Sequence, residues 1–227
     1  MSVFVRIVCV FFMLMFGGIY GLLKGKIDNR VLIFKALATF MAVLTAVYEA
    51  FQNTGMVSWL LVGAAVFCMA ADVLLELWII AGVIAFGTAH ILFISAFSMQ
   101  CTMKWYTAVI FVGMYLVFLI GLGKHLPKVE KMNQKKKVPD RLFKVGACLY
   151  PVLLCGTTAL AVTVAVQSVQ AGNAWKGRSG IAAGGGGILF MISDYLLAWR
   201  KLGEKRERRI RFLVLLFYYS AVYLLVW

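Results

Sequence analysis

Long apolar runs set the strongest limit on what this chain can fold into. A transmembrane helix needs about 20 mainly apolar residues to cross the hydrocarbon layer of a bilayer, and eight runs of comparable length follow one another along the sequence. The chain is therefore predicted to be an all-α polytopic membrane protein with about eight transmembrane helices. The predicted helices cover residues 3–23, 31–48, 58–77, 79–99, 105–122, 142–169, 180–199 and 212–227.

The composition excludes an ordinary soluble protein. The chain is 63% hydrophobic and 14% charged, whereas soluble domains are about 45–50% apolar and about 25% charged. Because the helices leave no room for a soluble domain, residues 1–227 are predicted to form a single membrane domain. The net charge of +14 lies between the apolar runs, so the lipid bilayer with its anionic headgroups is the expected partner, and no nucleic acid.

The distribution of basic residues predicts the orientation in the membrane. The segments 24–35, 124–144 and 200–211 hold 19 lysines and arginines, and the opposite connections hold four. Basic residues concentrate on the cytoplasmic side. With an even number of crossings, both termini are predicted to be non-cytoplasmic, most simply in a bacterial cytoplasmic membrane.

A weak internal repeat relates the two halves of the chain. An offset of 122 residues aligns 63–75 with 185–197, so that Asp72 meets Asp194 and a Gly, a Met and two Leu also coincide. The two segments belong to helices four apart, which run in the same direction. This pattern favours a duplicated four-helix unit with parallel repeats. The alternative is a likeness by apolar composition alone.

Ionisable residues within the apolar runs are the first candidates for function, because a charge at the centre of a membrane helix costs about 2.5–3.5 kcal/mol on insertion scales. Asp72, His90 and Asp194 lie well inside their predicted helices. The two aspartates are expected at matched depth near the cytoplasmic face. Glu49 and Glu76 lie at helix ends, where water is expected to reach them, although Glu76 is one turn after Asp72 on the same helix face.

The aspartate pair suits proton chemistry. Two carboxylates in a poorly solvated site do not readily hold two negative charges, so one can stay protonated at neutral pH. Such a pair can act as general acid and base on an acid-labile ether or acetal, or as the proton relay of a transporter. A purely structural contact between helices is the third possibility.

The other motifs indicate packing. The run Gly184–Gly187 lacks the Gly-Lys-Ser/Thr that would follow in a phosphate loop, and small residues let membrane helices approach closely. Ser193 has no Gly-x-Ser-x-Gly around it. The five cysteines form no CxxC pair and are expected to be buried and apolar. No metal and no cofactor are expected.

The segments around these residues resemble the YhhN family, whose characterised members are lysoplasmalogenases. The likeness lies in segments 63–75, 82–90 and 187–198, which carry Asp72, His90 and the pair Ser193 and Asp194. Further positions where the family tends to carry Lys or Tyr are Lys35, Tyr150 and Tyr218. The chain departs from the family pattern at Ala71, Phe93 and Val222.

The resemblance implies a membrane-embedded hydrolase that cleaves the vinyl ether bond of a lysophospholipid to a fatty aldehyde and a glycerophospho-headgroup. Asp72 and Asp194 would then be the catalytic carboxylates. His90, Tyr150 and Ser193 would orient water or support the site, and Lys35 with nearby basic residues would hold the phosphate.

Two functions of other classes compete with the hydrolase. A small proton-coupled transporter or lipid carrier would use the same aspartates, and its expected hallmark is helices broken by proline at membrane depth. Only Pro151 of the three prolines lies in a predicted helix, which argues mildly against transport. A non-catalytic scaffold would tolerate neutral residues at both aspartate positions.

Overall fold

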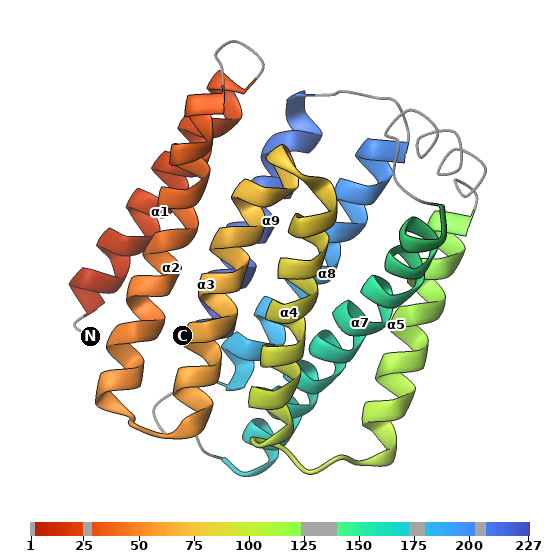
Figure 1. Cartoon of the computed structure of the whole chain (residues 1–227). Helices are drawn as coiled ribbons and strands as arrows, with labels where there is room; N and C mark the ends of the chain where they lie inside the picture. The colour runs from red at the N-terminus through yellow and green to blue at the C-terminus, as the bar shows by residue number, and fades with distance from the viewer. Residues whose placement is uncertain (1–2, 25–28, 124–139, 173–179, 203–207) are drawn as a thin grey trace.

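The all-α prediction is confirmed. The computed structural model describes residues 3–24, 29–123, 140–172, 180–202 and 208–227, and within them it contains eight α-helices and no strand (Figure 1). The helices are α1 (Val3–Leu23), α2 (Leu32–Gln52), α3 (Met56–Leu77), α4 (Ile79–Ser98), α5 (Trp105–Gly123), α7 (Asp140–Gln170), α8 (Gly180–Leu202) and α9 (Arg208–Val226), and a 3-10 turn, η1 (Asn29–Val31), precedes α2.

The helix lengths fit an integral membrane protein. Seven of the described helices are long and apolar enough to cross a membrane, and α5 contributes a shorter apolar stretch, Trp105–Gly121. The last helix begins at Arg208, four residues before the predicted start at 212. It therefore has 19 residues and is one of the seven helices long enough to cross a membrane. Large exposed apolar side chains lie along α1 and α5, including Phe4, Phe11 and Val109. Such faces are suited to contact with lipid.

The helices pack as a ring in which the last helix closes on the first. Contacts run between α1 and α2, α2 and α3, α3 and α4, α4 and α7, α7 and α8, and α8 and α9, and α9 returns to α1 and α2. Helix α5 lies at the edge of the bundle beside α7 (Figure 1). The hypothesis of a duplicated unit is compatible with this order, because the neighbours α1–α2, α2–α3 and α3–α4 correspond to α5–α7, α7–α8 and α8–α9.

A partly buried ion pair joins α1 to α2 at the end of the bundle where the chain begins and ends. The Arg6 Nη2 atom lies 2.9 Å from Glu49 Oε1, and the Arg6 guanidinium lies 5.3 Å from the ring centroid of Trp227. The Tyr223 hydroxyl donates to the carbonyl of Arg6. The expectation that water reaches Glu49 was wrong, because Arg6 and α9 cover this carboxylate, which is 5% exposed.

The glycine run packs α8 closely against its neighbours. An added Cβ at Gly187 would lie 3.0 Å from the Ala161 Cβ on α7, and one at Gly186 would lie 2.9 Å from the Leu225 nitrogen on α9. An added Cβ at Gly185 would have nothing within 4 Å. The run is therefore a packing surface, and only some of its glycines are required for it.

We expect Gly186→Ala to lower the stability of the protein and Gly185→Ala to raise it slightly. At residue 186 the new methyl group meets backbone atoms of α9, and overpacking of this kind costs about 1–3 kcal/mol. At residue 185 only the better helix propensity of Ala remains, which is worth about 1 kcal/mol. Thermal unfolding in detergent compares the two variants, and equal effects would contradict the close contact between α8 and α9.

Candidate active site

One pocket brings both intramembrane aspartates together. It lies at the end of the bundle opposite to the chain termini, between α1, α2, α3, α4, α8 and α9, and its free volume including the open mouth is about 480 Å³. Its lining comprises Tyr20, Lys24, Lys35, Asp72, Leu75, Glu76, Phe86, Ser193, Asp194, Leu197, Arg200, Arg211, Val214, Leu215 and Tyr218. Residues from distant parts of the sequence thus share one site.

Asp72 is held by two side chains of α2. Lys35 Nζ lies 3.2 Å from Asp72 Oδ1 and also donates to the Asp72 carbonyl at 2.9 Å. The Thr39 hydroxyl donates to Asp72 Oδ2. Lys35 and Thr39 are four residues apart and therefore lie on the same face of α2. Lys35, Thr39 and Asp72 are all buried, so this ionic contact is shielded from water.

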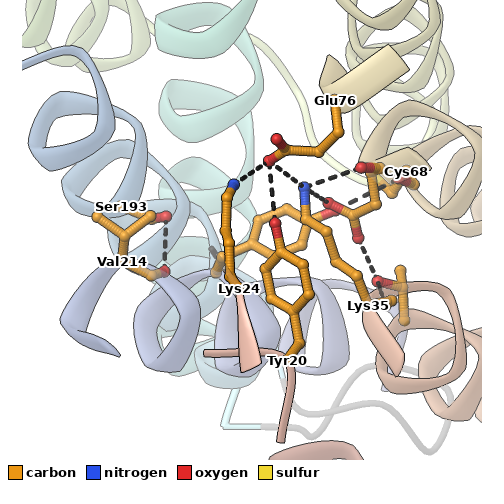
Figure 2. A network of polar contacts seen from close by, with 10 residues as sticks. Tyr20, Lys24, Lys35, Cys68, Glu76, Ser193 and Val214 are labelled. Carbon is orange, nitrogen blue, oxygen red and sulfur yellow. Dashed lines mark hydrogen bonds and ion pairs between the residues drawn. The ribbon is translucent and has the colours of Figure 1, made fainter. Parts of the chain in front are cut away.

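Glu76 extends the ionic network toward the mouth of the pocket. Figure 2 shows polar atoms of Tyr20, Lys24 and Lys35 converging on this carboxylate. The Tyr20 hydroxyl donates to Glu76 Oε1 at 3.0 Å, Lys24 forms an ion pair with the same oxygen, and Lys35 Nζ lies 3.9 Å away. Burial lowers the pKa of the Lys24 ammonium below its usual value, although the Glu76 carboxylate acts in the opposite direction.

Asp194 lies on α8 and is linked to α7. The Tyr150 hydroxyl donates to Asp194 Oδ2, although Tyr150 is not among the residues that line the pocket. The neighbouring Ser193 donates its hydroxyl to the Val214 carbonyl of α9 at 3.0 Å (Figure 2). Tyr150 therefore positions the carboxylate from behind, whereas Ser193 ties α8 to α9.

His90 lies behind the pocket lining. Its ring centroid is 4.9 Å from that of Phe190 and 5.5 Å from that of Tyr150, and its Nδ1 lies 3.0 Å from the Thr157 hydroxyl. The histidine is fully buried. Among the sequence-predicted residues, Lys35, Asp72, Ser193, Asp194 and Tyr218 line the pocket, whereas His90 packs against Phe190 and Tyr150, which are themselves outside the lining.

Part of the pocket lining is aromatic and apolar. The Tyr218 ring packs edge-on against Phe86 at 5.8 Å between centroids, and its hydroxyl donates to the Cys68 carbonyl at 3.4 Å. Leu75, Phe86, Leu197, Val214 and Leu215 complete the apolar part of the lining. Ionic groups and a hydrocarbon surface therefore meet within the same pocket.

Sequence reasoning missed four charged residues of the lining. In the sequence, Lys24, Arg200 and Arg211 do not differ from the other basic residues that predict the topology, and Glu76 lies at a helix end. The spacing of four residues between Asp72 and Glu76 was the one available signal. Within the described residues, no group of three or more His, Cys, Asp or Glu side chains is arranged to hold a metal ion.

Ser193→Ala is expected to lower stability by about 1 kcal/mol, the usual net value of one hydrogen bond, while activity per folded molecule stays close to that of the unmodified protein. The reason is that the hydroxyl donates to the backbone of α9 instead of pointing its hydrogen at a ligand. Thermal unfolding and activity measured on the same preparation test this. A large loss of activity without a loss of stability would give Ser193 a chemical role.

Comparison with known proteins extends over nearly the whole chain. The sequence model of the YhhN family matches residues 3–227. No curated protein and no solved structure matches the sequence.

Proposed function

Because the chain belongs to the YhhN family over residues 3–227, we propose that it is a membrane-embedded hydrolase that cleaves the vinyl ether bond of lysoplasmalogen-type lysophospholipids. The products would be a fatty aldehyde and a glycerophospho-headgroup. The observation that carries the proposal is one pocket whose lining combines Asp72 and Asp194 with basic residues and with apolar side chains.

The division of the pocket matches an amphiphilic substrate. The headgroup of a lysophospholipid is charged, its chain is apolar, and the vinyl ether lies at the junction of the two. In the pocket, Asp72 and Asp194 lie deeper than Glu76 and Arg200 on α3 and α8, and the same lining includes the apolar surface of Phe86 and Leu215. A lipid whose chain contacts the apolar wall would thus present its ether oxygen and vinyl carbons to the carboxylates.

The contacts of Asp72 support different roles for the two carboxylates in the proposed reaction. The Lys35 ammonium and the Thr39 hydroxyl stabilise the ionised form of Asp72. Two negative charges in one poorly solvated pocket repel each other, so Asp194 is the group that carries a proton before the reaction. Tyr150 holds Asp194 in position through its hydroxyl.

The reaction then proceeds in three steps. Asp194 donates its proton to the vinyl carbon that is not bonded to oxygen, and the carbon bonded to oxygen becomes an oxocarbenium centre. Asp72 stabilises this positive charge and takes a proton from the water that attacks the centre. The resulting hemiacetal collapses: the bond between this carbon and the glycerol oxygen breaks, the glycerol oxygen takes the proton held by Asp72, the hemiacetal hydroxyl returns a proton to Asp194, and the chain leaves as an aldehyde.

The position of the pocket accords with entry from one leaflet. Its mouth lies at the end of the bundle that carries Lys24, Arg200 and Arg211, where the distribution of basic residues predicts the cytoplasmic side. Both chain ends lie at the other end of the bundle (Figure 1). We propose that the protein resides in a bacterial cytoplasmic membrane with both termini outside, and that the lipid enters from the cytoplasmic leaflet.

The experiment that tests the function is aldehyde release from vinyl-ether lysophospholipids with ethanolamine and choline headgroups by the purified protein. We expect aldehyde and glycerophospho-headgroup in equal amounts. If neither headgroup yields aldehyde, the proton-coupled transporter or lipid carrier becomes the better proposal. The unbroken course of α3 through Asp72 and of α8 through Asp194 favours the hydrolase, since discontinuous helices are typical of transporter binding sites.

A further inference from the structure

Two arginines in the mouth of the pocket stand apart from the lysine network. Lys24 pairs with Glu76, and Lys35 pairs with Asp72. Arg200 and Arg211 line the same pocket, yet within the described residues neither forms an ion pair with a carboxylate. The Arg211 Nε atom is buried and has no hydrogen-bond partner in the described part of the chain. A buried donor without a partner is costly, so an anion at this position would stabilise the pocket.

Both arginines lie on the mouth side of the aspartates. Arg200 follows Asp194 by six residues on α8, a rise of about 9 Å, and side chains of a helix lean toward its N-terminus, here back toward Asp194. Arg211 lies in the first turn of α9, where the positive end of the helix dipole also attracts anions. Two arginines of the same pocket lining and a helix N-terminus thus lie at the mouth of the pocket.

We propose that Arg200 and Arg211 bind the phosphate of a phosphate-bearing lipid whose ether group lies at Asp72 and Asp194. This inference rests on the proposed function for the place of the lipid, but not for the bond that is cleaved. Arginine binds phosphate oxygens through paired N–H donors, a geometry that lysine lacks. Because Lys35 is held by Asp72, it acts on the carboxylate, and the arginines recognise the phosphate in its place.

The spacing of the two groups fits one molecule. The glycerol unit separates the ether oxygen from the phosphorus by only a few bonds, less than the helix rise of about 9 Å between Asp194 and Arg200. The long arginine side chain, leaning back along α8, closes the difference. The structure thus assigns the phosphate directly attached to glycerol to this site, and leaves the remainder of the headgroup at the open mouth.

The test measures equilibrium binding of a saturated alkyl-ether lysophosphocholine to the protein in lipid nanodiscs. This lipid cannot undergo vinyl ether hydrolysis, and empty nanodiscs give the baseline. We expect Arg200→Gln and Arg211→Gln each to weaken binding about tenfold or more, in line with a lost charge-assisted hydrogen bond. Arg209→Gln removes the same charge from an exposed position of α9 outside the pocket lining and is expected to bind as the unmodified protein does.

Three further ligands separate recognition of a lipid phosphate from recognition of free phosphate and from a general role of the arginines in the shape of the pocket. A neutral alkylglycerol of the same chain length should bind the arginine variants and the unmodified protein equally. Inorganic phosphate and glycerophosphocholine, used as competitors, separate recognition of free phosphate from recognition of a lipid, and only weak competition is expected from either. Because the probe is not cleaved, the result is independent of whether the protein hydrolyses vinyl ethers.

The proposal is overturned by either of two results. If both arginine variants bind the alkyl-ether lysophosphocholine as tightly as Arg209→Gln does, the arginines do not contact the phosphate. If they lose the neutral alkylglycerol to the same extent as the phosphate-bearing ligand, the arginines support the pocket as a whole and do not recognise phosphate.

Discussion

Asp194→Asn is expected to lower aldehyde release from a vinyl-ether lysophospholipid by about 10²–10⁴-fold, the usual contribution of a positioned general acid or base. The amide of Asn keeps the shape of the side chain and can still accept the hydrogen bond from Tyr150, but it has no carboxyl proton to donate to the vinyl carbon. Asp72→Asn is expected to reduce turnover to a similar degree, because the oxocarbenium centre would then lack its stabilising anion.

The control for these variants is Glu49→Gln. Glu49 is also a buried carboxylate with a basic partner, but it lies at the opposite end of the bundle from the pocket. We expect this variant to lose stability and to keep its activity per folded molecule. An Asp194→Asn protein that folds and still turns over within tenfold of the unmodified rate would exclude Asp194 as the acid.

Lys35→Met is expected to destabilise the protein by about 3–5 kcal/mol, the cost of leaving one member of a buried ion pair without its partner. The side chains of Lys35 and Asp72 are only 9% and 2% exposed, so water cannot replace the missing ammonium. The double variant Lys35→Met, Asp72→Asn removes both charges and is expected to recover most of the lost stability while remaining inactive. Thermal unfolding of the two single variants and the double variant gives the coupling between the residues.

Lys24→Met provides the comparison for this prediction. Lys24 also pairs with a carboxylate, but its side chain and that of Glu76 are each 30% exposed, and pairs that water can reach contribute about 1 kcal/mol or less. Equal losses of stability from Lys24→Met and Lys35→Met would show that burial does not determine how much each ion pair contributes to stability. An additive effect of Lys35→Met and Asp72→Asn would show that Lys35 and Asp72 are not coupled.

The fold was predictable because each membrane helix is encoded locally. A run of apolar residues long enough to cross a bilayer is helical whatever surrounds it, since backbone hydrogen bonds must be satisfied within the segment. The ends were harder to predict. Arg208 and Arg209 precede the apolar part of α9, and hydrophobicity alone places the start of that helix at residue 212, whereas the helix begins at Arg208.

The site was only partly predictable because it depends on which helices pack together. Asp72 and Asp194 are conspicuous in apolar runs, and the repeat between their segments places them at matching positions. Arg200 and Arg211 look the same in sequence as the other basic residues near helix ends, and only the contact of α8 with α9 separates those in the pocket from those outside it. His90 is conspicuous in the sequence because ionisable residues are rare in apolar helices, yet it packs among aromatic rings beside the site instead of lining it.

Acid catalysis by the two carboxylates is tested most directly by running the reaction in heavy water and locating the deuterium in the aldehyde soon after mixing. Proton donation to the vinyl carbon predicts one deuterium on the carbon next to the aldehyde group in each product molecule, and this labelled aldehyde is expected to form about 10²–10⁴-fold more slowly when Asp194→Asn replaces the unmodified protein. Aldehyde that forms without deuterium at that carbon, or that forms equally fast with both proteins, would contradict acid catalysis by this pair of carboxylates.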